Sequence, residues 1–296
     1  MDVKLTNLEK VYFPRDGITK GDLIAYYAAV SKWLIPYLAH RPITLQRYPD
    51  GIDSPSFFEK NVPRGAPPAV PTVTLTSSGK RSAVTYVLCN DEPTLLWLAN
   101  LGTITFHAWM SHEPSLDVPD YALFDLDPSE GCTLGTLARV ALGIRDSLDG
   151  IGLAPLVKTS GGKGLHLLLP LKPVYRYDEV KDFANIVAQR MSELRPGDVT
   201  LERSLAKRPP GTVYIDSVQV GRGKTIVPPF VVRARDGAPV SMPLAWDEVE
   251  AMERASSPDR ERLAQWTLRN VPDLLKRKAS LEPALEKAAR AWRTAG

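Results

Sequence analysis

The chain has 296 residues, 44% of them hydrophobic and 24% charged, and a net charge of +3. This length and apolar content suffice for one large domain or two modest lobes with a buried core, and they exclude a disordered chain. No stretch approaches the roughly 18–20 uncharged apolar residues of a membrane span, and the N-terminus lacks the apolar core of a signal peptide. The two cysteines are too few for a disulfide framework or a zinc knuckle, so we expect a protein of the reducing cytoplasm.

The positive charge is concentrated in one segment. Between Arg203 and Arg235 lie seven basic residues and a single acidic one, Asp216, which gives this segment a net charge of +6 and leaves the rest of the chain at −3. Such a concentration is typical of a surface that binds phosphates. A solvated charged face explains the charges alone equally well.

The first half of the chain predicts one long helix followed mainly by strands. From Thr19 to about Leu38 the apolar residues recur at helical spacing, and Thr19 is a suitable N-cap. The next expected elements are a strand over 43–48, a β-hairpin over 73–88 with Lys80 and Arg81 at its tip, a helix over 94–101, and strands over 103–109 and 121–127.

The second half mixes helices and strands. We expect a helix over 134–148, two strands flanking a glycine turn near residue 162, a helix over 177–194 capped by Asp178 or its neighbour, strands over 213–220 and 229–235, and charged helices from Trp246 to the C-terminus. This order of elements indicates an α/β or α+β architecture.

The sharpest local signal is the sequence Phe124-Asp125-Leu126-Asp127-Pro128. Because alternate residues of a strand project to the same face, both carboxylates point one way while Phe124 and Leu126 face the core. Two like charges this close need a counter-ion, and a divalent cation with oxygen ligands supplies one. The alternative is a strand that ends in a solvated Asp-Pro turn.

Asp216 is a candidate third carboxylate. It lies in the apolar segment VYIDSVQV, which would not hold a lone carboxylate without a partner. If it meets Asp125 and Asp127, the three would form a two-metal site for phosphoryl or nucleotidyl transfer. The alternative is an aspartate on an edge strand that faces water.

Three glycines in four positions mark the segment from Ser160 to His166. They let backbone N–H groups approach phosphate oxygens, and the side chains of Ser160, Lys163 and His166 can donate hydrogen bonds. The segment is not a P-loop of the Walker type, because a glycine follows Lys163 and a strand follows the turn. His166 could instead be a packed core histidine, although the adjacent turn favours contact with a ligand.

Taken together, the carboxylates, the glycine turn and the basic segment indicate metal-assisted chemistry on a nucleoside triphosphate. A two-metal nuclease would use similar carboxylates but would need no triphosphate pocket. A non-catalytic nucleic-acid-binding module would leave the carboxylates unexplained.

These motifs resemble the polymerase domain of bacterial ligase D, a member of the archaeo-eukaryotic primase superfamily that acts in non-homologous end joining. The similarity runs from about residue 5 to about residue 245. It is carried by the segments TNLEKVYFPRDGITK, RPITLQRYPDG, SPSFFEKNVP, DLDPSEG, SGGKGLH and YIDSVQVGRGKTIVPPFVVRAR. The resemblance implies an α+β, primase-like fold, in which mostly antiparallel sheets are flanked by helices and two closely packed lobes surround an active-site cleft.

The resemblance also implies how the chain is organised. Residues 1–296 would form a single primase-polymerase domain. It would have an N-terminal lobe over about 1–115 that binds DNA ends, a catalytic lobe over about 116–245 and a C-terminal helical segment over about 246–296.

The resemblance assigns roles to individual residues as well. Asp125, Asp127 and Asp216 match the catalytic metal ligands of the family, which hold two divalent ions, Mn²⁺ or Mg²⁺. The implied nucleotide-binding residues are His107, Ser160, Gly161, Gly162, Lys163, His166, Lys224, Arg233 and Arg235. The implied DNA-binding residues are Asn7, Lys10, Lys20, Phe57, Phe58, Lys60, Lys80, Arg81, Lys207 and Arg208.

Two segments depart from the family pattern. Val220 stands where the family commonly has asparagine before its GRGKT run, and PPFVVRAR replaces the more usual APYSPRAR. The side chains around the triphosphate could therefore be arranged differently, whereas the proposed metal ligands are unchanged.

The expected activity is that of a DNA-dependent DNA/RNA polymerase of the end-joining type. By resemblance it adds NTPs, or less readily dNTPs, to primer 3′ ends at gaps, nicks and broken ends that carry a 5′-phosphate. The resemblance also implies Ku and an ATP-dependent DNA ligase as partners, and a place on the nucleoid of the cytoplasm. A primase that starts strands without a primer is the closest alternative function.

Overall fold

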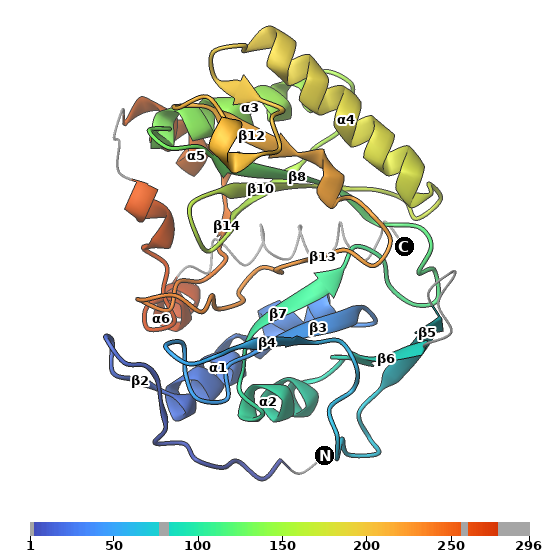
Figure 1. Cartoon of the computed structure of the whole chain (residues 1–296), viewed down its shortest axis with the longest axis vertical. Coiled ribbons are helices and arrows are strands. Elements are labelled where there is room, and N and C mark those ends of the chain that lie inside the picture. The colour runs from blue at the N-terminus through green and yellow to red at the C-terminus, as the bar shows by residue number, and fades with distance from the viewer. Residues whose placement is uncertain (1–2, 77–82, 256–259, 278–296) are drawn as a thin grey trace. The chain divides into compact units, whose positions relative to one another are not determined.

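The computed structural model describes residues 3–76, 83–255 and 260–277 (Figure 1). The chain divides into two compact units, which we describe separately. Unit 1 contains the described residues of Met1–Pro114, Thr225–Ser241 and Trp266–Glu282, and unit 2 contains those of Ser115–Lys224 and Met242–Gln265. Thr225–Ser241 therefore belongs to unit 1, although the catalytic lobe expected from the sequence runs to about residue 245.

Unit 1 is built on an antiparallel sheet. Among the described residues its strands run in the order β13-β7-β3-β6-β5, and β4 pairs with the free part of β3. Their bounds are β3 Pro42–Arg47, β4 Phe57–Glu59, β5 Thr72–Thr76, β6 Ala83–Leu88, β7 Thr103–Trp109 and β13 Thr225–Ile226. A small separate hairpin is formed by β1 (Val11–Phe13) and β2 (Ile18–Thr19).

The helices in the described part of unit 1 are α1 (Lys20–Leu38), α2 (Glu92–Asn100) and α6 (Val271–Arg277). The N-terminus of α1 is fixed by a capping box, in which the Thr19 side chain accepts from the backbone N–H of Asp22 and the Asp22 side chain accepts from that of Thr19. The hydroxyl of Tyr27 on α1 donates to the carbonyl of Ile104 on β7. The predicted helix and its N-cap are thus found in the structure.

Unit 2 contains a second sheet with the strand order β11-β12-β8-β10-β9-β14 among the described residues. All pairings are antiparallel except that of β11 with β12. The strands are β8 Tyr121–Pro128, β9 Leu156–Thr159, β10 Leu165–Pro170, β11 Val199–Thr200, β12 Val213–Asp216 and β14 Pro243–Leu244.

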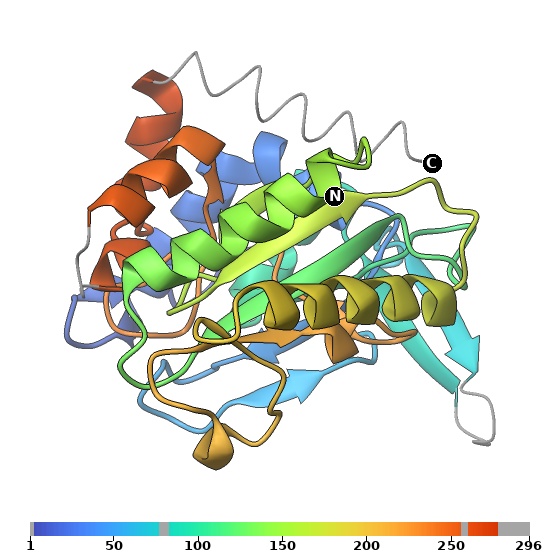
Figure 2. The same cartoon turned by 90° about the horizontal axis from the view of Figure 1, so that it is seen from above.

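Helices α3 (Leu134–Asp149) and α4 (Tyr177–Leu194) lie along the unit 2 sheet, as the view in Figure 2 shows. Helix α5 (Trp246–Arg254) packs on α3, where the Arg145 guanidinium pairs with Glu250. Short 3₁₀ helices complete the unit: η1 (Leu205–Lys207), η2 (Ser217–Gln219) and η3 (Arg260–Ala264). The α+β class expected from the sequence, with antiparallel sheets flanked by helices, is confirmed. No helix in the described residues is long and apolar enough to cross a membrane.

Three local predictions are wrong. Helix α4 takes Arg176, not Asp178, as its N-cap residue. The strand expected over 213–220 ends at Asp216, because the carboxylate of Asp216 accepts from the backbone N–H of Val218 and starts η2 instead. No strand forms over 229–235, since Phe230 has a φ of 66° and Val232 makes only an isolated bridge to Val240. The tip of the 73–88 hairpin and the C-terminal tail helix lie outside the described residues.

Removing the cap of α1 should measurably destabilise the protein. Thr19→Ala deletes the side-chain acceptor for the Asp22 N–H, and losses of this kind typically cost about 1 kcal/mol. Urea unfolding followed by circular dichroism measures the change, and Thr19→Ser, which keeps the hydroxyl, is the matched control. If both variants unfold at the same urea concentration as the unmodified protein, the capping box contributes nothing.

Candidate active site

The paired aspartates lie on β8 as their spacing predicts. Asp125 and Asp127 are two residues apart on this strand, so their side chains project to the same face. The residues that alternate with them, Phe124 and Leu126, are fully buried. The carboxylates are therefore held in place by a core strand rather than by a solvated turn.

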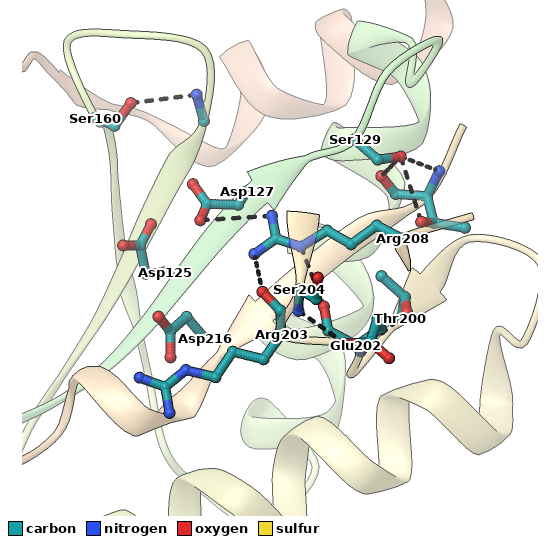
Figure 3. A network of polar contacts seen from close by, with 12 residues as sticks. Asp125, Asp127, Ser129, Ser160, Thr200, Glu202, Arg203, Ser204, Arg208 and Asp216 are labelled. Atoms are coloured by element: carbon teal, nitrogen blue, oxygen red, sulfur yellow. Dashed lines mark hydrogen bonds and ion pairs between the residues drawn. The ribbon is translucent and has the colours of Figure 1, made fainter. Parts of the chain in front are cut away.

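Asp216 joins the other two carboxylates. Strand β12 pairs antiparallel with β8 and sets Asp216 directly opposite Asp125 and Tyr214 opposite Asp127. Because directly opposed residues share a face of the sheet, the three carboxylates gather on one face, as Figure 3 shows. Strand β12 lies between β11 and β8, so Asp216 is not on an edge strand.

Burial and the neighbouring carboxylates together raise the pKa of Asp127. The Asp127 side chain is 51% exposed. Its partial burial and the negative charge of Asp125 raise this pKa to about 6, Asp216 adds to the effect, and the Arg208 guanidinium opposes it. The ionised forms of the three carboxylates thus repel one another, and a cation among them would relieve the repulsion.

Arg208 supplies part of the positive charge in this cluster. Its side chain is only 8% exposed, and its guanidinium lies 3.9 Å from the carboxylate of Asp127 and stacks 4.0 Å from the ring centre of Tyr214. Its Nε donates to the carbonyl oxygen of Glu202. Arg208 is expected from the sequence among the DNA-binding residues, but in the structure its side chain packs against the carboxylates (Figure 3).

The donor set fits hard divalent cations. Three carboxylates on one face offer oxygen ligands, which Mg²⁺ and Mn²⁺ prefer. In their present rotamers Asp125 faces His166, Asp127 faces Arg208 and Asp216 caps η2. Accordingly, within the described residues no group of three or more His, Cys, Asp or Glu side chains is already arranged to hold a metal ion.

The glycine turn between β9 and β10 is closed by Ser160. Its hydroxyl oxygen accepts from the backbone N–H groups of Gly162 and Gly164, each at 3.2 Å, and Gly161 has a φ of 71°. A Cβ at Gly164 would lie 2.3 Å from the carbonyl oxygen of Leu126. Only glycine therefore allows this turn to approach β8, next to Asp125 and Asp127.

His166 contacts one carboxylate of the cluster, that of Asp125. Its ring is 5% exposed, and its Nε2 is 3.3 Å from Oδ1 of Asp125. Its Nδ1 is 2.8 Å from Nζ of Lys158, a lysine on β9 that is 1% exposed. His166 is thus buried, as a core histidine would be, but it also contacts a candidate metal ligand.

The other basic residues expected around the triphosphate in unit 2 differ in their surroundings. Lys163, in the glycine turn, is exposed. The ammonium of Lys224 instead donates to the carbonyl oxygen of Val218 at η2. Lys207, expected to bind DNA, is exposed on η1.

Unit 1 holds the remaining expected nucleotide-binding residues. On β7, burial and the charge of Arg233 lower the pKa of His107 to about 3, so its ring is neutral. Its Nε2 is buried and has no hydrogen-bond partner among the described residues, and the same holds for the hydroxyl of Thr44, directly opposite on β3. Buried polar atoms of this kind normally have partners. Arg233 is half-buried and Arg235 is exposed.

The aromatic residues expected to bind DNA are exposed on β4, which pairs with β3 of the unit 1 sheet. Phe57 and Phe58 on β4 are 44% and 61% exposed. The guanidinium of Arg47 lies 5.2 Å from the ring centre of Phe57, and the ring centre of Phe58 lies 5.5 Å from that of His107. Phe58 therefore connects the expected DNA-binding residues with an expected nucleotide-binding residue.

The N-terminal residues expected to bind a 5′-phosphate come together in unit 1. The backbone N–H of Lys20 donates to the carbonyl of Lys10, and that of Lys10 to the carbonyl of Asn7. Burial and the nearby Lys10 charge lower the pKa of the Lys20 ammonium, and the ammonium of Lys10 pairs with the carboxylate of Asp50. The ammonium groups of Lys10 and Lys20 thus lie near each other, beside the backbone turn that begins at Asn7.

The expected site residues are divided between the two units. The carboxylates, the glycine turn and His166 lie in unit 2, whereas His107, Arg233, the aromatic pair and the N-terminal lysines lie in unit 1. Lys60 is exposed next to β4, and Lys80 and Arg81 lie outside the described residues. The sequence analysis assigns no role to Lys158. Its position opposite His166 could have been predicted, because a hairpin centred on residue 162 pairs position 158 with position 166.

Replacing Asp127 with asparagine should stabilise the metal-free protein at neutral pH. Its folded-state pKa of about 6 lies above the ordinary value of 3.8. The folded protein therefore binds more protons than the unfolded chain and loses stability as the pH rises through this window. The gain in stability from Asp127→Asn should be small at about pH 4 and larger at about pH 7. Thermal unfolding in the presence of a chelator, which keeps the protein free of metal, measures this gain.

The matched control for this substitution is Asp53→Asn, at an exposed aspartate in unit 1. In Asp53→Asn, the melting temperature should differ between the two pH values by as much as it does in the unmodified protein. If Asp127→Asn shifts the melting temperature equally at both pH values, the pKa of Asp127 is not raised in the folded protein.

Comparison with known proteins identifies relatives of this chain. The family model described as the LigD primase-polymerase domain matches residues 19–281. The multifunctional non-homologous end joining DNA repair protein LigD of Mycobacterium tuberculosis is 35% identical over 256 residues, 84% of this chain and 33% of the relative. The bifunctional non-homologous end joining protein LigD of Bacillus subtilis is 34% identical over 250 residues, with 84% and 40% covered. The chain thus spans a third to two fifths of these relatives.

A solved structure with the same fold is also found. It is the polymerase domain from Mycobacterium tuberculosis ligase D in complex with DNA, with 33% sequence identity and a TM-score of 0.85. The match covers 94% of this chain and 95% of that one. The similarity therefore extends over nearly the whole of both chains.

Proposed function

This chain belongs to the family of LigD primase-polymerase domains, nucleotidyltransferases of non-homologous end joining, and we propose that it extends primer 3′ ends at gaps and breaks in DNA. Its substrates would be NTPs, with dNTPs used less readily. The observation that carries this function to the residues is the convergence of Asp125, Asp127 and Asp216 on one face of the unit 2 sheet.

We propose that these carboxylates hold two divalent cations, Mn²⁺ or Mg²⁺. All three would bind one ion, and Asp125 and Asp127 would also bind the second. When bound, such ions lower the pKa of the attacking 3′-hydroxyl and stabilise the pyrophosphate that leaves. The protein contributes a rigid strand, β8, that keeps two of the carboxylates on the same face.

Two groups of donors would bind the triphosphate. Backbone N–H groups of the glycine turn, with the side chains of Ser160, Lys163 and His166, would bind phosphate oxygens, as would Arg233 and Arg235. His107 has a neutral, buried ring whose Nε2 lacks a partner among the described residues, so a polar group of the nucleotide could bind it.

DNA would be held mainly by unit 1. Base stacking on Phe57 and Phe58 would contribute roughly 1–3 kcal/mol per base. Lys10 and Lys20, with Asn7, would bind the 5′-phosphate of the strand across the gap, since phosphate contacts position nucleic acids. Lys60, Lys80, Arg81, Lys207 and Arg208 would contact the template or the primer end.

The partners follow from the same proposal. The relatives are named as end-joining proteins, and one is solved in complex with DNA. We propose that this chain acts with Ku and an ATP-dependent DNA ligase on chromosomal breaks, in the cytoplasm on the nucleoid. Binding of the purified chain to Ku bound at a DNA end would test this directly.

Asp125→Ala should abolish nucleotide addition. The change removes a carboxylate assigned to both metal ions, and we expect extension to fall by more than about a hundredfold. Extension of a labelled primer on a gapped duplex, with Mn²⁺ and each NTP or dNTP, measures this. Affinity for the gapped duplex, measured by fluorescence anisotropy, should change little.

Asp53→Asn is again the matched control and should extend the primer normally. Extension at the unmodified rate by Asp125→Ala would contradict the assignment of the carboxylates. Shortening of the labelled primer without nucleotide would indicate a nuclease, and synthesis without any primer would indicate a primase.

Lys10→Ala should weaken the preference for a 5′-phosphate at the gap. Contacts between charged groups of this kind are worth about a tenfold change in affinity. We therefore expect the ratio of affinities for phosphorylated and unphosphorylated gaps to fall roughly tenfold. Lys32→Ala, an exposed lysine on α1, is the control, and an unchanged ratio for Lys10→Ala would remove Lys10 from the phosphate site.

A further inference from the structure

Lys158 is a buried lysine that the proposed mechanism does not use. It lies on β9, is only 1% exposed and is among the largest fully buried side chains of the molecule. Lysine is almost never fully buried unless its ammonium has partners. Two of its partners are Nδ1 of His166, at 2.8 Å, and the carbonyl oxygen of Thr159, at 3.3 Å.

The register of the sheet sets Lys158 in line with the site. His166 on β10 is directly opposite Lys158 on β9, and on its other side it is directly opposite Asp125 on β8. Asp125 is in turn opposite Asp216 on β12. Directly opposed side chains share a face, so Lys158, His166, Asp125 and Asp216 form one row across four strands.

The chemistry of the row determines where the proton of His166 lies. A lysine ammonium has three donors and no acceptor, so the ring nitrogen that faces it must accept. A neutral imidazole that accepts at Nδ1 carries its proton on Nε2. This Nε2 is the atom that lies 3.3 Å from Oδ1 of Asp125, which can only accept when ionised.

We propose that Lys158 is a positioning residue that fixes His166 in the tautomer protonated on Nε2. The ring then presents a donor, not a lone pair, to the side of the site where the carboxylates lie. In the opposite tautomer, the Nε2 lone pair would face the carboxylate of Asp125 and repel it. The inference rests on the proposed function only in its consequence, which is that His166 can donate to an oxygen of the bound triphosphate.

A purely structural lysine makes a different prediction. If Lys158 only balanced the charge of the carboxylates, its loss would change stability but not the protonation pattern of the His166 ring. The two roles are therefore separated by a measurement on the ring nitrogens themselves, rather than by activity.

The chain is suited to such a measurement because it has four histidines. With ¹⁵N-labelled histidine and no divalent metal, long-range ¹H–¹⁵N spectra at neutral pH report which nitrogen of each ring carries the proton. His166→Gln identifies the His166 signals by their disappearance. We expect an acceptor-type Nδ1 and a protonated Nε2 for His166 in the unmodified protein.

Lys158→Met removes the donor while keeping a side chain of similar length. The ratio of the Nε2–H to the Nδ1–H form of His166 should then fall by about tenfold or more. Lys172→Met, at an exposed lysine just after β10, is the control and should leave the spectrum unchanged. If Lys158→Met does not fold, Lys158→Gln takes its place: its amide oxygen can accept from an Nδ1–H, so the same ratio should fall.

Three results would overturn the inference. They are a His166 protonated on Nδ1 in the unmodified protein, a His166 protonated on both nitrogens, and an unchanged ratio in folded Lys158→Met. Because primer extension is measured separately, a protein with the expected tautomer but no polymerase activity would overturn the proposed function and leave this inference standing. Normal primer extension together with any of the three results would overturn this inference and leave the proposed function standing.

Discussion

The antiparallel register of β9, β10, β8 and β12 is the constraint on which the site depends. It sets Lys158, His166, Asp125 and Asp216 opposite one another, strand by strand. A slip of one residue in any of these pairings would send a side chain to the other face of the sheet. The fully buried apolar residues on either side of Asp125 resist such a slip, since it would expose them. The hydrophobic pattern of the core thus positions the polar groups.

The site is assembled at a cost in stability. The carboxylates on one face repel one another, and this repulsion adds to burial, the larger cause, in raising the pKa of Asp127. The guanidinium of Arg208, stacked on Tyr214 and 3.9 Å from the Asp127 carboxylate, offsets part of this repulsion, and the Arg208 side chain is largely buried. Local conflicts of this kind are expected where a protein binds or reacts rather than where it only folds. The repulsion and the partial compensation fit a site that receives a cation.

Much of this arrangement can be read from local patterns. The alternation around Asp125, the cap at Thr19 and the strands on either side of the glycine turn depend on near neighbours, and all are found. The strand over 229–235 was not recognisable as irregular, because the positive φ of Phe230 follows from its tertiary surroundings. The contact of Arg208 with Asp127 could not be predicted either, since it depends on how a long loop folds back.

The order in which the chain contributes to its two units limits how the protein can be divided. Within the described residues, the backbone passes from one unit to the other after Pro114, Lys224, Ser241 and Gln265. Strand β13 completes the sheet of unit 1, and strand β14 completes the sheet of unit 2. Both strands come late in the chain, after all the other strands of the two sheets. No single cut yields two fragments that each hold a whole sheet with its helices. Neither half can be exchanged between relatives as a contiguous cassette, and the ribosome must pass residue 226 before the first sheet can close and residue 244 before the second can.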